Sequence, residues 1–224
     1  MAFLIQKYQQ LQRDIQESCR KAGRNPENVS IVAATKYCTV EEMNDALLAG
    51  ITDVGENRVQ DAVKKFHLLS GACNKHFIGH LQTNKVKKAV ELFDVIESVD
   101  RIELIEKLAM ETERTGKILD VLLQVNVAKD GAKFGCDPEG IDVLVAKLGQ
   151  AKNLIFKGFM SIIPFTENVE DARLWFRRMR EIYEKYQGQF EALDTLSIGM
   201  SHDFRVAIEE GATQVRIGSL IFKE

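Results

Sequence analysis

The sequence has few of the residues that build disulfide scaffolds or metal sites. Its four cysteines are scattered without a C-x-x-C pair, and its four histidines show no spacing typical of zinc ligands. We therefore expect no metal, and a reducing, cytoplasmic environment rather than an oxidising one. The cysteines are Cys19, Cys38, Cys73 and Cys136, and the histidines are His67, His76, His80 and His202.

Long apolar runs, an excess of charge of one sign and proline-rich linkers are also missing. No apolar run approaches the length of a membrane span, and the first ten residues lack the pattern of a signal peptide. The net charge of -3 gives no reason to expect nucleic acid or an anionic membrane as a partner. With three prolines and no low-complexity stretch, residues 1–224 are predicted to form one domain.

The sequence does contain a regular alternation of short apolar runs and amphipathic segments. An amphipathic helix over 3–22 is followed by eight repeats on the scale of one βα unit. Unbroken apolar runs are typical of parallel strands covered by helices. We predict a single (β/α)8 TIM barrel with an extra N-terminal helix. An open doubly wound sheet is the alternative, but its glycine fingerprint is missing after the first strand. The predicted strands span 30–36, 53–56, 76–79, 95–99, 120–127, 156–163, 195–198 and 215–217. The helices predicted between and after them span 40–49, 59–69, 83–92, 102–115, a segment that ends at 148, 169–187 and 203–210.

Polar residues gather where these strands end, which is the face where barrel enzymes bind their ligands. Lys36 ends the first strand, Asn57 follows the second and His80 follows the third. The Lys36 amine could condense with a carbonyl, pair with a phosphate or remain a solvent-exposed charge. His80 could be a general acid or base, although it could instead only cap the next helix, and Asn57 could be a loop or cap residue.

The last two strands give the most informative pattern. Ser201 lies in G-M-S-H-D after the seventh strand, and Gly218-Ser219 follows the eighth. Barrels often bind phosphate between these two loops, although Ser201 could instead be a helix N-cap. Arg216 lies within the apolar eighth strand, where a guanidinium needs a partner. It could form a salt bridge, for example to Glu56, or face a ligand beside the phosphate.

Several long motifs in one order resemble a known family, the pyridoxal 5′-phosphate (PLP) homeostasis proteins or YggS/PROSC family. These proteins look like the barrel domain of bacterial alanine racemase without its second domain. The resemblance covers nearly the full length of the chain. The motifs are A-A-T-K, V-G-E-N-R-V-Q-D, H-F-I-G-H-L-Q-T-N-K, L-Q-V-N-V-A-K-D-G-A-K-F-G, G-F-M-S-I-I-P, L-S-I-G-M-S-H-D-F and V-R-I-G-S-L-I-F.

The resemblance implies a role for each candidate residue. Lys36 would hold PLP as a Schiff base, with Asn57 beside the cofactor and Arg216 facing the pyridine nitrogen. The phosphate would be held by Ser201, Gly218 and Ser219.

The resemblance also implies a function in intracellular PLP (vitamin B6) homeostasis without strong catalytic turnover. We expect a monomer, with PLP-dependent apo-enzymes as partners. A PLP-dependent amino-acid racemase is the first alternative, and a barrel isomerase of a phosphorylated metabolite, without PLP, is the second. His80 and the basic stretch from Asn84 to Lys88 are left without an assigned role.

Overall fold

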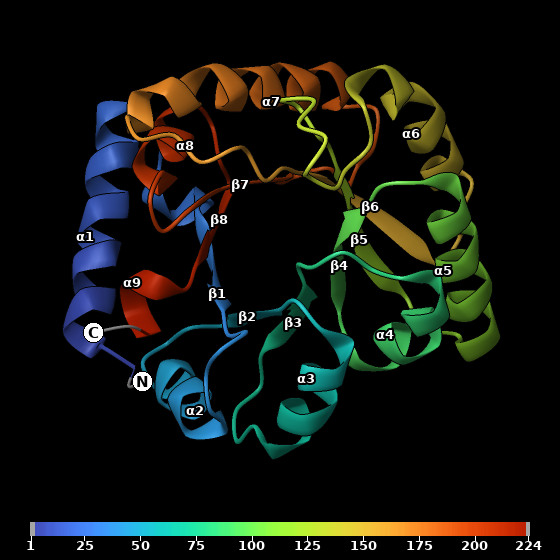
Figure 1. Cartoon of the computed structure of the whole chain (residues 1–224), viewed down its shortest axis with the longest axis horizontal. Helices are drawn as coiled ribbons and strands as arrows, with labels where there is room; N and C mark the ends of the chain where they lie inside the picture. Colours follow the sequence, from blue (N-terminus) through green and yellow to red (C-terminus); the bar gives the residue numbers. More distant parts are fainter. Residues whose placement is uncertain (1–2, 223–224) are drawn as a thin grey trace.

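Eight parallel strands close into a barrel in which each strand pairs with the next and β8 pairs with β1 (Figure 1). The computed structural model describes residues 3–222, so residues 1, 2, 223 and 224 of the predicted domain lie outside the described part. The predicted TIM barrel is confirmed. The strands are β1 (Ser30–Ala34), β2 (Asp53–Glu56), β3 (Asn74–Phe77), β4 (Val95–Val99), β5 (Leu119–Gln124), β6 (Leu154–Met160), β7 (Thr195–Met200) and β8 (Gln214–Ile217).

The extra N-terminal helix is α1 (Ile5–Lys21), which lies outside the ring formed by the repeats (Figure 1). Its apolar stripe of Tyr8, Leu11 and Ile15 is buried, as its helical spacing predicts. The helix packs against α8 (Phe204–Glu209) and α9 (Ser219–Phe222). Helix α1 therefore covers the two helices that follow β7 and β8.

The remaining helices follow the strands in the predicted order, but several are shorter than predicted. Three predicted helices include a 3₁₀ turn at one end, at Phe66–Leu68, Thr83–Lys85 and Val169–Ala172. Such turns are frequent at helix termini and leave the hydrophobic period almost unchanged, so the pattern does not reveal them. The helices are α2 (Val40–Leu48), α3 (Val59–Lys65), α4 (Val86–Leu92), α5 (Ile102–Thr115), α6 (Ile141–Gly149) and α7 (Arg173–Tyr186).

The first strand ends two residues before Lys36, not at Lys36 as predicted. The Cys38 N–H donates to the Thr35 carbonyl over 2.9 Å, and this bond closes a turn directly after β1. Lys36 is exposed on that turn. The predicted ends of β5 and β6 also lie too far along the sequence. Each strand stops pairing in the sheet before its apolar run ends, so the apolar pattern overestimates the length of the strand.

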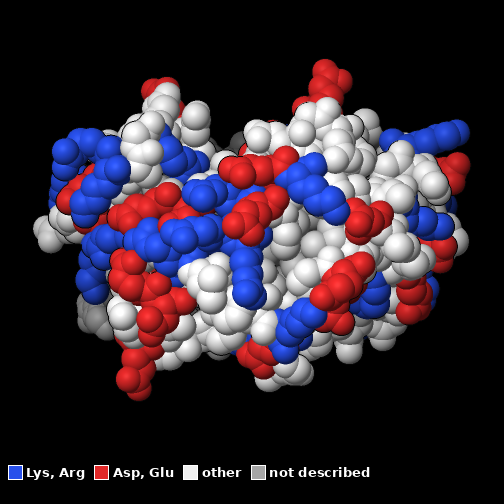
Figure 2. All heavy atoms as spheres, turned by 90° about the horizontal axis from the view of Figure 1, so that it is seen from above, with Lys and Arg blue, Asp and Glu red and all other residues white. Residues whose placement is uncertain are grey.

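The outer surface of the barrel carries charges of both signs. On the face seen from above Figure 1, basic and acidic side chains are interspersed (Figure 2). Arg173 on α7, for example, is paired with Glu209 at 2.7 Å and with Glu210 at 3.0 Å. Within residues 3–222, no helix is both long enough and apolar enough to cross a bilayer.

Gly158 is the point where β6 changes its pairing register with β5. Its φ of +144° is a conformation that L-residues with a side chain rarely adopt, and an added Cβ would overlap the Thr195 carbonyl oxygen of β7. A glycine is therefore required where β5, β6 and β7 meet.

We expect Gly158→Ala to lower the free energy of unfolding by at least about 2 kcal/mol, because it combines backbone strain with overlap. Urea denaturation measures this change. Gly140→Ala is the matched control: an added Cβ there meets nothing within 4 Å. The control should stay within about 0.5 kcal/mol of the wild type. Equal stability of the two variants would contradict the strained geometry of β6.

Candidate functional site

A cavity of about 360 Å³ opens at the carboxyl ends of β1, β7 and β8. This volume falls within the range of small-molecule sites. Five of the six predicted site residues line it: Lys36, Ser201, Arg216, Gly218 and Ser219. The sixth, Asn57, lines a separate pocket at the ends of β2 and β3. The other six lining residues were not among the predicted site residues: Ala34, Tyr37, Cys38, Met200, His202 and Phe222.

Lys36 is exposed at the cavity wall, and the backbone before it is held by side chains of β2 and α3. Its Nζ lies 5.0 Å from the centroid of the Tyr37 ring. The preceding Thr35 is buried, and its hydroxyl donates to Glu56 Oε1 over 3.1 Å. Lys65 Nζ donates to the Thr35 carbonyl over 2.9 Å and pairs with Glu56 at 2.6 Å. This ion pair fixes the turn that presents Lys36.

Lys65 was not found from the sequence. A lysine on an amphipathic helix ordinarily belongs to its solvated face, and nothing in the local pattern marks this one. Only the packing of α3 against the end of β1 gives it a role.

The loops after β7 and β8 are joined by a hydrogen bond. The Gly218 N–H donates to Ser201 Oγ over 3.2 Å. Because the Ser201 oxygen accepts this bond, its hydroxyl hydrogen remains able to donate into the cavity. The helix N-cap reading of Ser201 is wrong: Asp203 occupies that position before α8, and its Oδ1 accepts the Met200 N–H over 2.6 Å.

Gly218 also lies close against the first strand. An added Cβ would come within 3.1 Å of the Ala34 carbonyl oxygen and 3.3 Å of the Ala34 Cβ. A glycine therefore allows the β8 loop to approach the strand that leads to Lys36.

Arg216 is buried, and the barrel wall holds its guanidinium. Nη1 donates to the Ser197 carbonyl over 2.7 Å, and Nη2 donates to the Ser161 carbonyl over 2.7 Å. Of the two alternatives for Arg216, the salt bridge is present but Glu56 is the wrong partner, because Glu56 pairs with Lys65. The carboxylate nearest to the guanidinium is Glu97, at 4.0 Å. Burial lowers the pKa of Arg216, and the Glu97 charge opposes this change.

Glu97, in the middle of β4, is fully buried inside the barrel. Ser197 Oγ donates to its Oε2 over 2.7 Å, and Gln214 Nε2 donates to its Oε1 over 2.8 Å. His76 Nδ1 lies 2.7 Å from Oε1, and His76 Nε2 lies 3.1 Å from Asp53 Oδ1. A continuous polar chain therefore runs from Asp53 through His76 and Glu97 to Arg216 at the cavity.

The two central groups of this chain hold opposite charges. Burial disfavours protonation of His76, but its hydrogen bonds with Asp53 and Glu97 outweigh burial and raise its pKa to about 9. Burial acts against the Glu97 carboxylate too, yet the hydrogen bond with His76 holds its pKa below its usual range. Near neutral pH the barrel interior therefore contains an ion pair.

His80 and Asn57 line the second pocket, next to the first on the same face of the barrel. The His80 ring stacks on Phe134 with centroids 3.9 Å apart, and its Nδ1 lies 3.6 Å from Asp100 Oδ2. His80 does not cap the following helix, because Gln82 holds the N-cap position. It does not line the cavity that contains Lys36.

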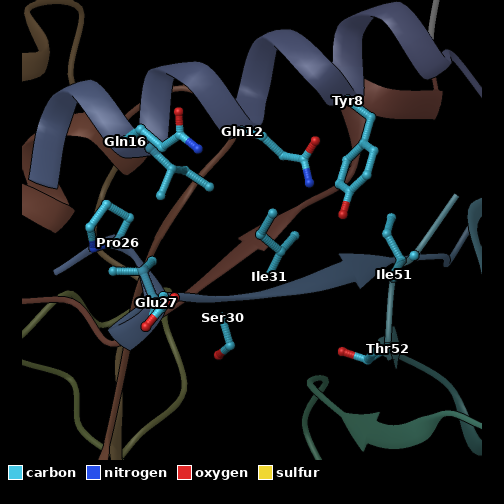
Figure 3. A pocket seen from close by; sticks show the side chains of 12 residues that line it. Tyr8, Gln12, Gln16, Pro26, Glu27, Ser30, Ile31, Ile51 and Thr52 are labelled. Carbon is cyan, nitrogen blue, oxygen red and sulfur yellow. The ribbon is translucent and has the colours of Figure 1, made fainter.

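A third hollow, of about 330 Å³, lies between α1 and the start of β1 (Figure 3). Tyr8, Gln12 and Gln16 extend from α1 toward Ser30 and Ile31 of the strand (Figure 3). Its lining contains no lysine, arginine or histidine, and it lies at the opposite end of β1 from Lys36. Among residues 3–222, no group of three or more His, Cys, Asp and Glu residues could hold a metal ion.

The barrel fold of this chain is that of a known class of protein domains. The family model of the alanine racemase N-terminal domain matches residues 7–224. Within that class, the chain belongs to the pyridoxal phosphate homeostasis protein family. It is 41% identical over 212 residues to the pyridoxal phosphate homeostasis protein of Aquifex aeolicus (strain VF5), covering 94% of this chain and 93% of that protein. The resemblance inferred from the motifs is confirmed.

Two solved structures are similar over nearly the whole chain. PipY of Synechococcus elongatus PCC7942, solved with PLP bound, is 32% identical with a TM-score of 0.82, covering 93% of this chain and 99% of that one. An unknown protein from Bifidobacterium adolescentis is 31% identical with a TM-score of 0.92, covering 97% and 94%.

The buried ion pair predicts how stability depends on pH. A histidine with a raised pKa contributes stability that is complete below its ordinary pKa of 6.5 and is lost as pH rises through about 9. We therefore expect the free energy of unfolding to fall by about 3 kcal/mol across this window, as measured by urea denaturation.

His76→Gln keeps hydrogen-bonding groups but cannot become charged. This variant should be less stable near pH 6 and should lose most of the decline between pH 6.5 and 9. A decline of the same size in the variant would assign it to other groups.

Proposed function

We propose that this chain holds PLP as a Schiff base on Lys36 and acts in intracellular PLP homeostasis. One observation carries the proposal: a single cavity contains Lys36 together with Ser201, Arg216, Gly218 and Ser219. The name of the Aquifex aeolicus relative and the PLP bound to PipY support it. We further propose that residues 1–224 form one PLP-binding unit, which works in the cytoplasm as a monomer and supplies PLP-dependent apo-enzymes.

The groups at one side of the cavity suit the phosphate of PLP. The hydroxyls of Ser201 and Ser219 can each donate a hydrogen bond to a phosphate oxygen, and Gly218 adds no side chain where its loop approaches Ala34. An uncharged ring alone would leave these donors without an acceptor. The phosphate therefore gives the site much of its affinity.

The groups at the other side suit the ring and the aldehyde. PLP supplies an aldehyde that condenses with an amine and a ring that withdraws electrons. Lys36 offers the amine from a turn that Lys65 and Glu56 hold in place. Arg216 has N–H donors and no acceptor, so it can bond a ring nitrogen only when that nitrogen carries no proton. An unprotonated ring nitrogen weakens electron withdrawal, which suits a carrier better than an enzyme.

The acid and base groups of the cavity also favour a carrier. Racemisation needs a proton-transferring group on each face of the substrate carbon, and Lys36 could serve one face. Burial raises the pKa of Cys38 to about 12, so its thiol keeps its proton. His80 lines the neighbouring pocket instead. His202 lines the cavity, with its Nε2 at 3.1 Å from the Thr166 carbonyl, and it is the observation that favours a racemase-like enzyme.

Borohydride reduction tests the covalent link. After incubation with PLP, reduction should fix a pyridoxyl group on Lys36, because among residues 3–222 it is the only lysine that lines the cavity. Mass spectrometry of peptides measures the site, with Lys36→Arg as the control that takes no label. Label mainly on Lys85 or Lys133, or no label on the wild type, would contradict the assignment of Lys36 as the Schiff-base lysine. If no PLP binds, the remaining hypothesis is a barrel isomerase of a phosphorylated metabolite.

The phosphate contacts predict a large difference between PLP and unphosphorylated pyridoxal, which should bind far more weakly. Ser201→Ala and Ser219→Ala should each weaken PLP binding by about 1–3 kcal/mol, because the phosphate loses a donor. Absorbance titration measures both effects. Ser70→Ala, at an exposed serine outside the cavity lining, is the control and should bind PLP like the wild type. Equal affinity for pyridoxal and PLP would place the phosphate site elsewhere.

Deuterium exchange at Cα distinguishes a carrier from an enzyme. Incubation of the PLP-loaded protein with L- and D-amino acids in D₂O should give exchange no faster than the Lys36→Arg background, because the Cys38 thiol keeps its proton and the His202 ring is held at the Thr166 carbonyl. Nuclear magnetic resonance of the amino acids measures the rate. Catalytic exchange that disappears in His202→Ala or His80→Ala would establish the racemase-like alternative and name its acid or base.

A further inference from the structure

The pocket next to the proposed cofactor cavity has a volume of about 450 Å³ and lies between two tight loops. The loop after β2 carries Asn57 and Arg58, and the loop after β3 carries His80. These loops meet at Gly79, where an added Cβ would overlap the Asn57 carbonyl group. Buried side chains of Val59, Phe77 and Leu81 also line the pocket. The pocket is therefore partly apolar and lies between two loops that are packed tightly against each other.

Two buried polar atoms of this pocket have no hydrogen-bond partner in the described part of the chain. They are Asn57 Oδ1 and His80 Nδ1. Buried polar atoms in folded proteins nearly always have a partner, so each of these requires an explanation. Asp100 is the nearest acidic group to His80, but at 3.6 Å it is beyond hydrogen-bond distance. Both atoms line one pocket, which points to a single bound molecule as their partner.

The charges around this pocket favour an anion. Arg58 and Lys85 line it from opposite loops, and within residues 3–222 neither has a carboxylate at salt-bridge distance. Asp61 is the one carboxylate among the lining residues, so two basic side chains face one acidic side chain. The fork of the Arg58 guanidinium matches the oxygens of a phosphate, and a dianion uses two cations better than a carboxylate does.

We propose that this pocket is a second ligand site, which binds a small phosphate monoester that also carries an amine. Arg58 and Lys85 bind the phosphate, and the apolar floor contacts the carbon skeleton. Asn57 Oδ1 can only accept a hydrogen bond, so it requires a donor, and Asp61 favours a positively charged one. An amine on the ligand satisfies both. This second site does not depend on PLP being bound at Lys36.

The test uses pyridoxamine 5′-phosphate, which has the required phosphate and amine and has no aldehyde to react with Lys36. The protein is first loaded with PLP and reduced with borohydride, so that the Lys36 cavity is filled. Isothermal titration calorimetry should then show one further equivalent of pyridoxamine 5′-phosphate binding. Arg58→Gln and Lys85→Gln should each weaken this binding at least tenfold. Lys87→Gln removes an exposed charge outside the pocket, from α4 directly after the 3₁₀ turn that ends at Lys85, and should bind like the wild type.

Two further probes identify what the pocket recognises. Unphosphorylated pyridoxamine should bind at least tenfold more weakly, and so should glycerol 3-phosphate, which lacks the amine. Binding of all three with equal affinity, no binding, or preferential binding of L-glutamate would overturn the proposal. An equal loss in Lys87→Gln and Lys85→Gln would also overturn it, because it would reveal a response to overall charge alone. If Lys36 takes no label, the proposed function fails, and titration of the unreduced protein still tests this pocket through Arg58 and Lys85.

Discussion

The Glu97 carboxylate is the group on which the interior of this barrel depends. A fully buried charge is costly unless hydrogen bonds and an opposite charge compensate for it, and here His76, Ser197 and Gln214 together do so. These partners come from β3 and, across the barrel from it, from the neighbouring strands β7 and β8. The same carboxylate lies 4.0 Å from Arg216, so the guanidinium that faces the cavity belongs to this network too. The inside of the barrel and the wall of the ligand site are therefore one electrostatic unit.

Two hollows at the carboxyl ends of the strands divide the polar residues between them. The loops after β1, β7 and β8 form one, and those after β2 and β3 form the other. The ion pair of Lys65 and Glu56 lies between them, since Glu56 ends β2 and Lys65 reaches the carbonyl before Lys36. A change in the loop after β2 can thus be transmitted to the turn that carries the amine. The proposed PLP site and the proposed second ligand site would then be coupled through the ion pair of Lys65 and Glu56.

Much of the fold could be predicted from the sequence, because local signals mark its elements. The bounds of β2, β4 and α5 match the prediction, and α5 ends at Gly116, whose φ of +68° suits a helix stop. Five of the six candidate residues meet in one cavity because parallel strands bring their carboxyl ends together. The partners of buried charges could not be predicted in this way. Glu97 is 119 residues from Arg216 in the sequence (216 minus 97), and which inward side chains meet depends on the stagger of the strands.

The bond between the two ends of the described chain has a consequence for synthesis on the ribosome. The Leu4 N–H donates to the Ile221 carbonyl over 2.9 Å, and α1 lies beside α9 (Figure 1). Gly218, Ser219 and Phe222 line the cavity. Residues 218–222 are synthesised after β1 to β7, so a nascent chain that stops before them lacks one wall of the ligand site. A chain truncated before Gly218 would then be unable to retain the ligand, and ligand retention would report that synthesis had passed these residues.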